Sequence, residues 1–199
     1  MLSKGLERAN LHKRFAIYML RITGSGSPLK LVLGFMLTTA VLSMWISNTA
    51  TILMMLPMAI AIINAVDNPR FGVALILGIA YSASLGGVGT PIGTPPNIIF
   101  MSVYEETQGT EYSFIDWMKT GVPIVILGVP IMALWLARGI KQVGNIDLPV
   151  PGTWTKAEKR VLAIFGTVAL AWIFRPFWTA WIGISTISDS TIAVAGVAA

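Results

Sequence analysis

Two short polar segments interrupt long uncharged stretches of this chain. Ser43 and the tripeptide Ser47-Asn48-Thr49 lie near the middle of residues 31–66, which carry no formal charge. Residues 85–97 form the second segment, with four glycines and three prolines inside another uncharged stretch, residues 71–104. Glycine and proline are both costly inside a helix, so a continuous helix cannot run through this second segment. The groups that such segments offer to a ligand are hydroxyl, amide and freed backbone carbonyl oxygens.

A helix-start signal follows each interruption. In the first, Ser47, Asn48 or Thr49 can cap a helix that continues to residue 63. In the second, Thr94 can cap a helix whose first residue is Pro95. The free N–H groups and positive dipole ends of two such helices attract carboxylates and other anions.

A cation is the second ligand that the sequence favours. The unwound carbonyl groups of residues 43–47 and 89–93 are neutral oxygens, which suit a sodium ion. Neither uncharged stretch contains a lysine or arginine to neutralise a bound anion, so a co-bound metal cation is the simplest neutraliser. Neither contains Asp, Glu or His, which proton relays use, and we therefore expect coupling to sodium.

Some of these side chains also have structural interpretations. Ser43 lies one helical turn before Ser47, so it can face the same site or bond back to its own helix. Capping alone would explain Thr49, whereas the Asn48 amide is costly in an apolar stretch unless it has partners. The glycines at 86, 87, 89 and 93 either unwind the helix or permit close helix packing.

The composition places these segments in a membrane. Of the 199 residues, 55% are hydrophobic and 12% charged, with a mean hydropathy of +0.74, whereas a soluble domain carries about 25% charged residues. The chain has no cysteine, which excludes a disulfide scaffold and a thiolate zinc site. The net charge of +5 comes from basic residues gathered in two blocks, a pattern of membrane orientation and not of nucleic-acid binding.

The uncharged stretches predict two membrane elements. As one straight helix, residues 31–66 would run about 54 Å, well beyond a hydrocarbon core of about 30 Å. Broken at Ser47-Asn48-Thr49, each limb is only about 24 Å long, which favours a re-entrant hairpin with this tripeptide at its tip. Residues 71–104 are interpreted as a discontinuous transmembrane helix, with one half ending near Ser84 and the other beginning near Pro95.

The rest of the chain divides around these two elements and completes an all-α integral membrane protein. We expect a cytoplasmic, basic amphipathic helix on the membrane surface at 1–30, a transmembrane helix at 121–139, a cytoplasmic linker at 140–160, a transmembrane helix at 161–181, and the start of a truncated transmembrane helix at 182–199.

Charge asymmetry orients these segments. Residues 1–30 carry six Lys/Arg and residues 138–160 carry five, whereas residues 104–119 carry only Lys119 against four acidic residues. The positive-inside rule therefore predicts that the first two segments are cytoplasmic and the third external. Arg175, expected near the outer surface, is the one exception.

The two polar segments also resemble those of a known family. Residues 43–51, Ser-Met-Trp-Ile-Ser-Asn-Thr-Ala-Thr, followed by Met-Met-Leu-Pro at 54–57, are similar to the first Ser-Asn-Thr signature of the divalent anion:sodium symporters. Gly86-Gly87 and residues 93–97, Gly-Thr-Pro-Pro-Asn, resemble the unwound fifth helix of that family. The resemblance implies an elevator-type transporter of C4-dicarboxylates or citrate-like anions with sodium, in a bacterial inner (plasma) membrane and dimeric at full length.

The resemblance also implies roles for particular residues. The substrate-binding residues would be Ser47, Asn48 and Thr49, with Thr94 and Pro95 on the opposite side. The sodium ligands would be Ser43, Ser47, Asn48 and the carbonyl group of Gly93, or of Gly89, because Gly-Thr-Pro occurs at both positions. The family has two inverted repeats, each with a Ser-Asn-Thr tip, and this chain has one, so we interpret it as the N-terminal repeat region, ending inside its next transmembrane helix.

Other functions stay open from the sequence. A relative could exchange dicarboxylates without sodium or carry another ion, such as sulfate, arsenite, or sodium exchanged for protons. A non-transporting membrane subunit is an alternative of another class. A membrane enzyme is disfavoured, because a chain with no cysteine and a single histidine, His12, offers no nucleophile–base pair.

Overall fold

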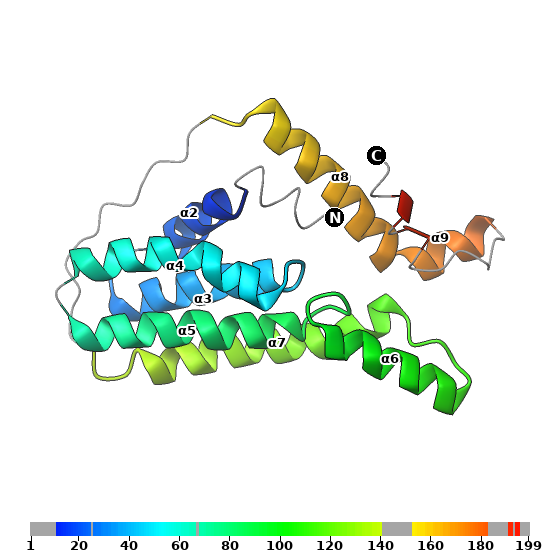
Figure 1. The fold of residues 1–199 in the computed structure, drawn as a ribbon, viewed down its shortest axis with the longest axis horizontal. Helices are drawn as coiled ribbons and strands as arrows, with labels where there is room; N and C mark the ends of the chain where they lie inside the picture. Colours follow the sequence, from blue (N-terminus) through cyan, green and yellow to red (C-terminus); the bar gives the residue numbers. More distant parts are fainter. Residues whose placement is uncertain are drawn as a thin grey trace.

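The computed structural model describes residues 11–24, 26–66, 68–140, 153–182, 191–192 and 194–195, which form helices and loops with no strand among them. The helices are α2 (Leu11–Thr23), α3 (Pro28–Ser43), α4 (Asn48–Ala65), α5 (Pro69–Gly87), α6 (Pro95–Gln108), α7 (Phe114–Leu136), α8 (Lys156–Ile173) and α9 (Arg175–Ile182). This architecture confirms the predicted all-α class (Figure 1). Three of the described helices, α4, α5 and α7, are long and apolar enough to span a membrane.

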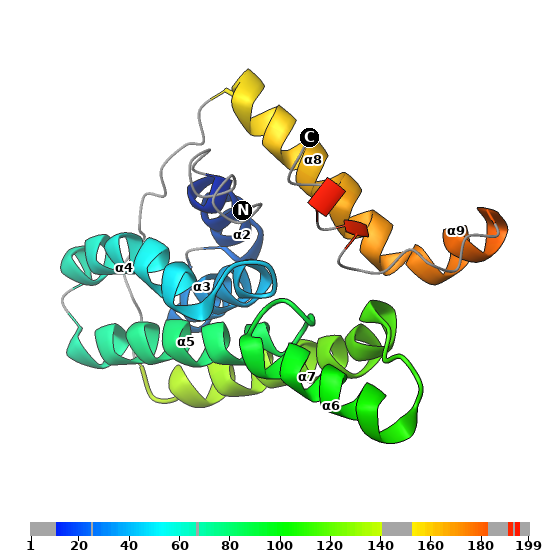
Figure 2. The same cartoon turned by 45° about the vertical axis from the view of Figure 1, so that its right-hand side comes forward.

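Helix α3 lies at the centre of the fold. It packs most extensively against α5 and next against α2, and it also contacts α4 and α7. In Figures 1 and 2, α5 and α7 run side by side along the same edge of the bundle. Leu31, Phe35 and Met36 of α3 lie in one buried cluster with Leu75 and Ile79 of α5. The sequence of α3, which has a single charged residue, Lys30, near its start, fits this position, because a helix without a polar face is typically buried.

The basic N-terminal segment differs from the single helix predicted over residues 1–30. Helix α2 ends at Thr23, and Gly24 follows with a φ of 84°, in the left-handed region that glycine adopts easily. Ser27 then caps α3, and Pro28 takes its first helical position. A second helix therefore begins inside the range that the sequence assigns to the first.

The structure has loops at both interrupted segments. Residues 44–47 join α3 to α4, and residues 88–94 join α5 to α6. Helix α5 ends at Gly87, three residues beyond the predicted end near Ser84. The described helix–loop–helix over 28–65 has limbs of 16 and 18 residues.

The glycine at position 86 lies inside α5, at a close contact with α3. A Cβ atom added to Gly86 would lie 2.4 Å from the carbonyl oxygen of Ala40 and 2.6 Å from its Cα atom. This glycine therefore allows α5 to touch the backbone of α3, and it stays within the helix.

Helix α7 is shifted toward the N-terminus relative to the span predicted over 121–139. Ser113 caps it by accepting the backbone N–H of Asp116 at 3.3 Å, so the helix begins at Phe114. At the other end the helix stops at Leu136, and Gly139 follows with a φ of 75°.

The single helix predicted over 161–181 is two helices in the structure. Helix α8 ends at Ile173 and α9 begins at Arg175, with the backbone of Phe174 at φ −95° and ψ 7° between them. Among the described helices, α8 does not belong to the three that could span a membrane by length and composition. Most of residues 182–199, predicted to begin a further transmembrane helix, lie outside the described residues.

The basic residue that departs from the predicted charge asymmetry has an acidic partner. The Arg175 side chain is 8% exposed and forms an ion pair with Glu111, which lies in the loop between α6 and α7. The positive charge at this position is therefore neutralised by one of the acidic residues of the segment that we predicted to be external.

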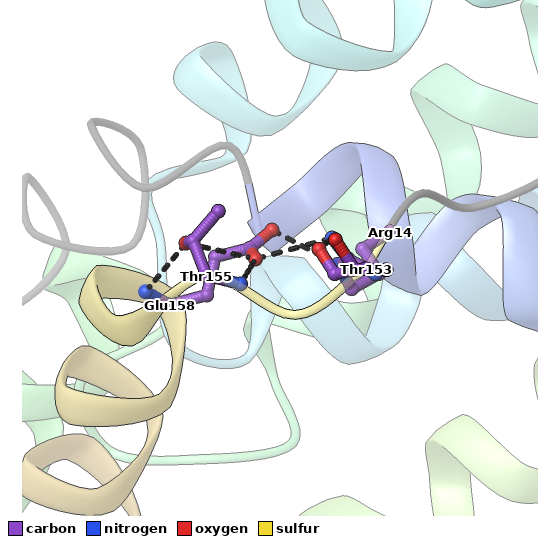
Figure 3. Close-up of polar contacts among 4 residues, drawn as sticks. All are labelled: Arg14, Thr153, Thr155 and Glu158. Atoms are coloured by element: carbon purple, nitrogen blue, oxygen red, sulfur yellow. Dashed lines mark hydrogen bonds and ion pairs between the residues drawn. The ribbon is translucent and has the colours of Figure 1, made fainter.

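The two basic segments of the sequence also meet, at an ion pair between α2 and α8 (Figure 3). Arg14 donates from Nε and Nη2 to the two carboxylate oxygens of Glu158 at 2.9 and 3.1 Å, and from Nη2 to the carbonyl oxygen of Thr153 at 3.0 Å. The backbone N–H of Thr155 donates to the same carboxylate at 2.7 Å. These hydrogen bonds, that of Thr155 first and that of Arg14 next, hold the pKa of Glu158 below its usual value.

Candidate functional site

The loop at residues 44–47 ends at the exposed N-terminus of α4. Ser47 is the N-cap, and its hydroxyl oxygen accepts the backbone N–H of Ala50 at 3.4 Å. Ser47 and Thr49 are exposed, and Asn48 is half-buried. The first-turn N–H groups of α4 therefore lie at the same helix end as these three uncharged polar side chains, in agreement with the predicted capping.

Ser43 connects this helix end to the interior of the fold. Its side chain is fully buried, and its hydroxyl lies 2.7 Å from the Asn48 side-chain oxygen and 2.7 Å from the carbonyl oxygen of Ala83. The sequence left open whether Ser43 bonds back to its own helix, and in the structure the hydroxyl reaches α4 and α5 instead. Ser43, Asn48 and the Ala83 carbonyl group thus bring three neutral oxygens together where α3, α4 and α5 meet.

The second loop, residues 88–94, is hydrogen-bonded to the first. The fully buried Thr90 hydroxyl donates to the carbonyl oxygen of Met44. Asn97, which is 5% exposed, donates from Nδ2 to the carbonyl oxygens of Gly87 and Thr90 at 2.7 and 2.8 Å. The unwound backbone is therefore held in place by side-chain bonds, as buried polar backbone requires.

Neither Thr90 nor Asn97 was among the predicted site residues. The cost of an amide in an apolar stretch, which we used to single out Asn48, applies equally to Asn97 and could have found it. Trp117 of α7 also holds the second loop, since its ring N–H donates to the carbonyl oxygen of Val88 at 2.7 Å. We did not predict this role, because the two residues are 29 positions apart in sequence.

Two glycines allow the loop to approach its neighbours. A Cβ atom on Gly93 would lie 2.4 Å from the carbonyl oxygen of Gly87, and one on Gly87 would lie 2.7 Å from the Asn48 side-chain oxygen. Gly93, Gly87 and Asn48 therefore form a stack in which no larger side chain fits. Gly89 contacts the first loop elsewhere, because its added Cβ would lie 2.7 Å from the methyl carbon of Met44.

An open pocket of about 490 Å³ lies between the two loops. It is lined by Trp45, Ser47, Ile92, Gly93, Pro95, Ile98 and Ile99. The pocket therefore joins the N-cap of α4, Ser47, to the first residue of α6, Pro95, whereas Asn48, Thr49 and Thr94 are not among its lining residues. Gly93 lines the pocket and Gly89 does not, which favours the Gly93 carbonyl group of the two alternatives.

Thr94 and Pro95 form the start of α6, and of these two residues Pro95 lines the pocket. Thr94 is the N-cap by its backbone, but its side chain makes no capping hydrogen bond. Pro95 takes the first helical position and is exposed. The Thr94 hydroxyl, half-buried at this helix end, is thus left available to a ligand.

The charge of the region comes from partial charges alone. Residues 31–66 and 71–104 carry no formal charge, and the described residues contain no cluster of three or more His, Cys, Asp or Glu side chains that could hold a metal ion. Two helix N-termini favour an anion, and the hydroxyl and carbonyl oxygens favour an alkali cation. The region therefore offers partial positive charge to an anion and neutral oxygens to an alkali cation.

Interrupted helices that direct their ends at a common pocket, in a chain with three candidate membrane spans, are the architecture of helical membrane transporters. The family profile described as "Citrate transporter" matches residues 1–198. The chain therefore belongs to this family of citrate transporters.

The relatives of known function agree with this assignment. The chain is 36% identical, over 98% of its length, to the sodium-dependent dicarboxylate transporter SdcS of Staphylococcus aureus strains USA300, NCTC 8325 and COL. These matches confirm the resemblance to the divalent anion:sodium symporters. The chain spans 42% of the length of each of these relatives.

Proposed function

We propose that this chain is the N-terminal repeat region of a secondary transporter that imports C4-dicarboxylates or citrate-like anions together with sodium ions. The observation that carries the proposal is the pocket at which the N-termini of α4 and α6 meet, beside the neutral oxygens of Ser43 and Asn48. The sodium-dependent dicarboxylate transporter at 36% identity supports both ligands.

The proposal assigns the site residues to the two ligands, and Ser47 and Asn48 contact both. Ser47, Asn48 and Thr49 bind one carboxylate group of the substrate, and Thr94 and Pro95 bind it from the α6 side. Ser43, Ser47, Asn48 and the carbonyl group of Gly93 bind the sodium ion. The sodium ion then cancels part of the charge of an anion for which the uncharged stretches supply no lysine or arginine.

The proposal also covers how the chain sits and moves in the membrane. The helix–loop–helix of α3 and α4 is a re-entrant hairpin that opens to the cytoplasm of a bacterial cell, and α2 lies on the cytoplasmic surface of the inner membrane. A second repeat supplies the other half of the site, and the full-length protein is a homodimer that works by an elevator motion. The ion pair between Arg14 and Glu158 supports this orientation, because it joins the two basic segments on one side.

Uptake of radiolabelled succinate tests the function. Proteoliposomes that contain the full-length protein are loaded with substrate-free buffer and given succinate in sodium or in potassium medium. The proposal predicts uptake that requires external sodium. Uptake of equal rate in both salts, increased by internal succinate, would identify an exchanger instead.

No uptake of succinate or citrate in either salt would contradict the proposal. Uptake of sulfate under those conditions would then identify a transporter of another anion. A protein that carries none of these solutes would fit the remaining alternative, a membrane subunit without transport activity of its own.

A further inference from the structure

One buried hydroxyl group distinguishes Thr51 from the other threonines of the fold. The Thr51 side chain is fully buried in α4, and its hydroxyl is the one buried side-chain polar atom among the described residues that has no hydrogen-bond partner. Buried polar groups are nearly always hydrogen-bonded, and an unpaired one costs free energy. The Thr51 hydroxyl group is therefore a candidate contact for a bound ligand.

Other helical threonines show what Thr51 would be expected to do. Each of these donates its hydroxyl to the backbone carbonyl oxygen four residues earlier: Thr23, Thr38, Thr39, Thr107, Thr167 and Thr179. The corresponding acceptor for Thr51 is the carbonyl oxygen of Ser47, which accepts the backbone N–H of Thr51 at 2.9 Å but not its hydroxyl. The usual local partner is thus present, and the Thr51 hydroxyl does not use it.

The position of Thr51 on α4 places it beside the proposed sodium ligands. It lies three residues after Asn48, so these two side chains are neighbours on the helix surface, with about 5–6 Å between their Cβ atoms. Side chains on a helix lean toward its N-terminus, which directs Thr51 toward Asn48. The same face continues into the buried residues Met55 and Ala59, so it faces the interior of the bundle.

We propose that the Thr51 hydroxyl oxygen is a further ligand of the sodium ion bound by Ser43, Ser47 and Asn48. This inference rests on the proposed function and adds one residue to its cation site. A hydroxyl oxygen gives a lone pair to a cation and is then no longer a buried group without a partner. This ligand would lie on α4, one helical turn further along the chain than the Ser-Asn-Thr tip.

The test compares Thr51→Val with Thr51→Ser in the full-length protein. Valine keeps the shape of threonine and removes the hydroxyl, whereas serine keeps the hydroxyl. The matched control is Thr39→Val, because Thr39 is equally buried and its hydroxyl is bonded within α3. Thermal unfolding in detergent is followed as sodium replaces choline, which gives the sodium concentration for half-maximal stabilisation of each variant.

We expect Thr51→Val to raise the half-saturating sodium concentration by about tenfold, the effect of losing one contact to a charged group. Thr51→Ser should restore most of the wild-type value, and Thr39→Val should leave it unchanged. In choline, Thr51→Val should unfold at the same or a higher temperature than wild type, because a buried group without a partner is gone. A purely structural role of Thr51 would lower stability in both salts equally.

Two results would overturn the inference. Wild-type sodium dependence in Thr51→Val, with impaired dependence in Asn48→Ala, would show that Thr51 is not a ligand while the proposed site stands. Wild-type dependence in both variants would contradict the proposed site itself. If Thr51→Val does not fold, Thr51→Ala and Thr51→Ser are compared instead, and equal sodium dependence of these two overturns the inference.

Discussion

The close contact between α3 and α5 makes one glycine-to-alanine change especially informative. In Gly86→Ala, the new Cβ atom would lie 2.4 Å from the carbonyl oxygen of Ala40, whereas ordinary van der Waals contact begins near 3.4 Å. The difference, 3.4 − 2.4 = 1.0 Å, is the distance by which the two helices must separate locally. Both atoms belong to regular helix backbone, so neither can rotate out of the way.

The separation would reach the candidate site within one helical turn. The Ser43 hydroxyl lies 2.7 Å from the Ala83 carbonyl oxygen, and these residues are three positions from Ala40 and Gly86 respectively. An increase of about 1 Å would take this hydrogen bond past the usual limit of about 3.2 Å. Overpacking costs about 1–3 kcal/mol and the lost bond about 1 kcal/mol, against a helix-propensity gain of about 0.5–1 kcal/mol. We therefore expect a net destabilisation of about 1–3 kcal/mol.

A second glycine provides the control. A Cβ atom on Gly166 in α8 would meet nothing within 4 Å, so Gly166→Ala should stabilise the protein by about 0.5–1 kcal/mol through helix propensity alone. Thermal unfolding of the full-length variants in detergent gives the sign of each change, and a sodium titration shows whether the Ser43 region is disturbed. The reasoning is refuted if Gly86→Ala is as stable as Gly166→Ala and binds sodium like wild type.

Three further predictions concern other contacts of the fold. Asn48→Ala should abolish sodium-dependent binding by removing an amide oxygen, whereas Thr39→Ala should be nearly silent; equal binding curves for the two would refute the assignment of the tip. Because the folded state holds the pKa of Glu158 below its usual value, the carboxylate stabilises the contact between α2 and α8 above the usual carboxyl pKa and loses this effect as the pH falls through the folded pKa. The protection factors of the α2 amides, obtained by dividing out the intrinsic pH dependence of exchange, should therefore fall on acidification in wild type but not in Glu158→Gln, and parallel pH profiles of protection would contradict this. Trp117→Phe keeps the ring but loses the N–H that donates to Val88, so it should cost about 1 kcal/mol in thermal stability, and a cost of zero would show that the bond contributes nothing.

The helix interruptions were predictable because their causes are local. Proline and glycine penalise helix wherever they occur, and the backbone of Thr94 followed by Pro95 forms the expected helix start. The prediction that α5 ends near Ser84 was wrong for a non-local reason. Gly86 and Gly87 serve close contacts with α3 and Asn48, and these partners are invisible from the composition of the segment.

The hydrogen bonds between the two loops could not be predicted from the sequence. Thr90 and Met44 are 46 residues apart, and only the packed fold brings the hydroxyl to that carbonyl group. The break at Phe174, in contrast, has a local cause that the sequence shows, because Pro176 has no backbone N–H to donate to the carbonyl oxygen of Trp172. The charge asymmetry flagged Arg175 as an exception, yet its partner Glu111 is 64 residues away in sequence and became evident from the structure alone.

The absence of formal charge from both uncharged stretches has an electrical consequence for the proposed transport cycle. Each elementary charge moved across a membrane exchanges about 2.3 kcal/mol with a potential of 100 mV. Residues 31–66 and 71–104 contribute no such charge, so the movement of this half of the site is insensitive to voltage when it is empty. In the proposed cycle, the response of the loaded half-site to membrane potential is then set by the number of sodium ions bound with each anion, because these two stretches add no charge of their own.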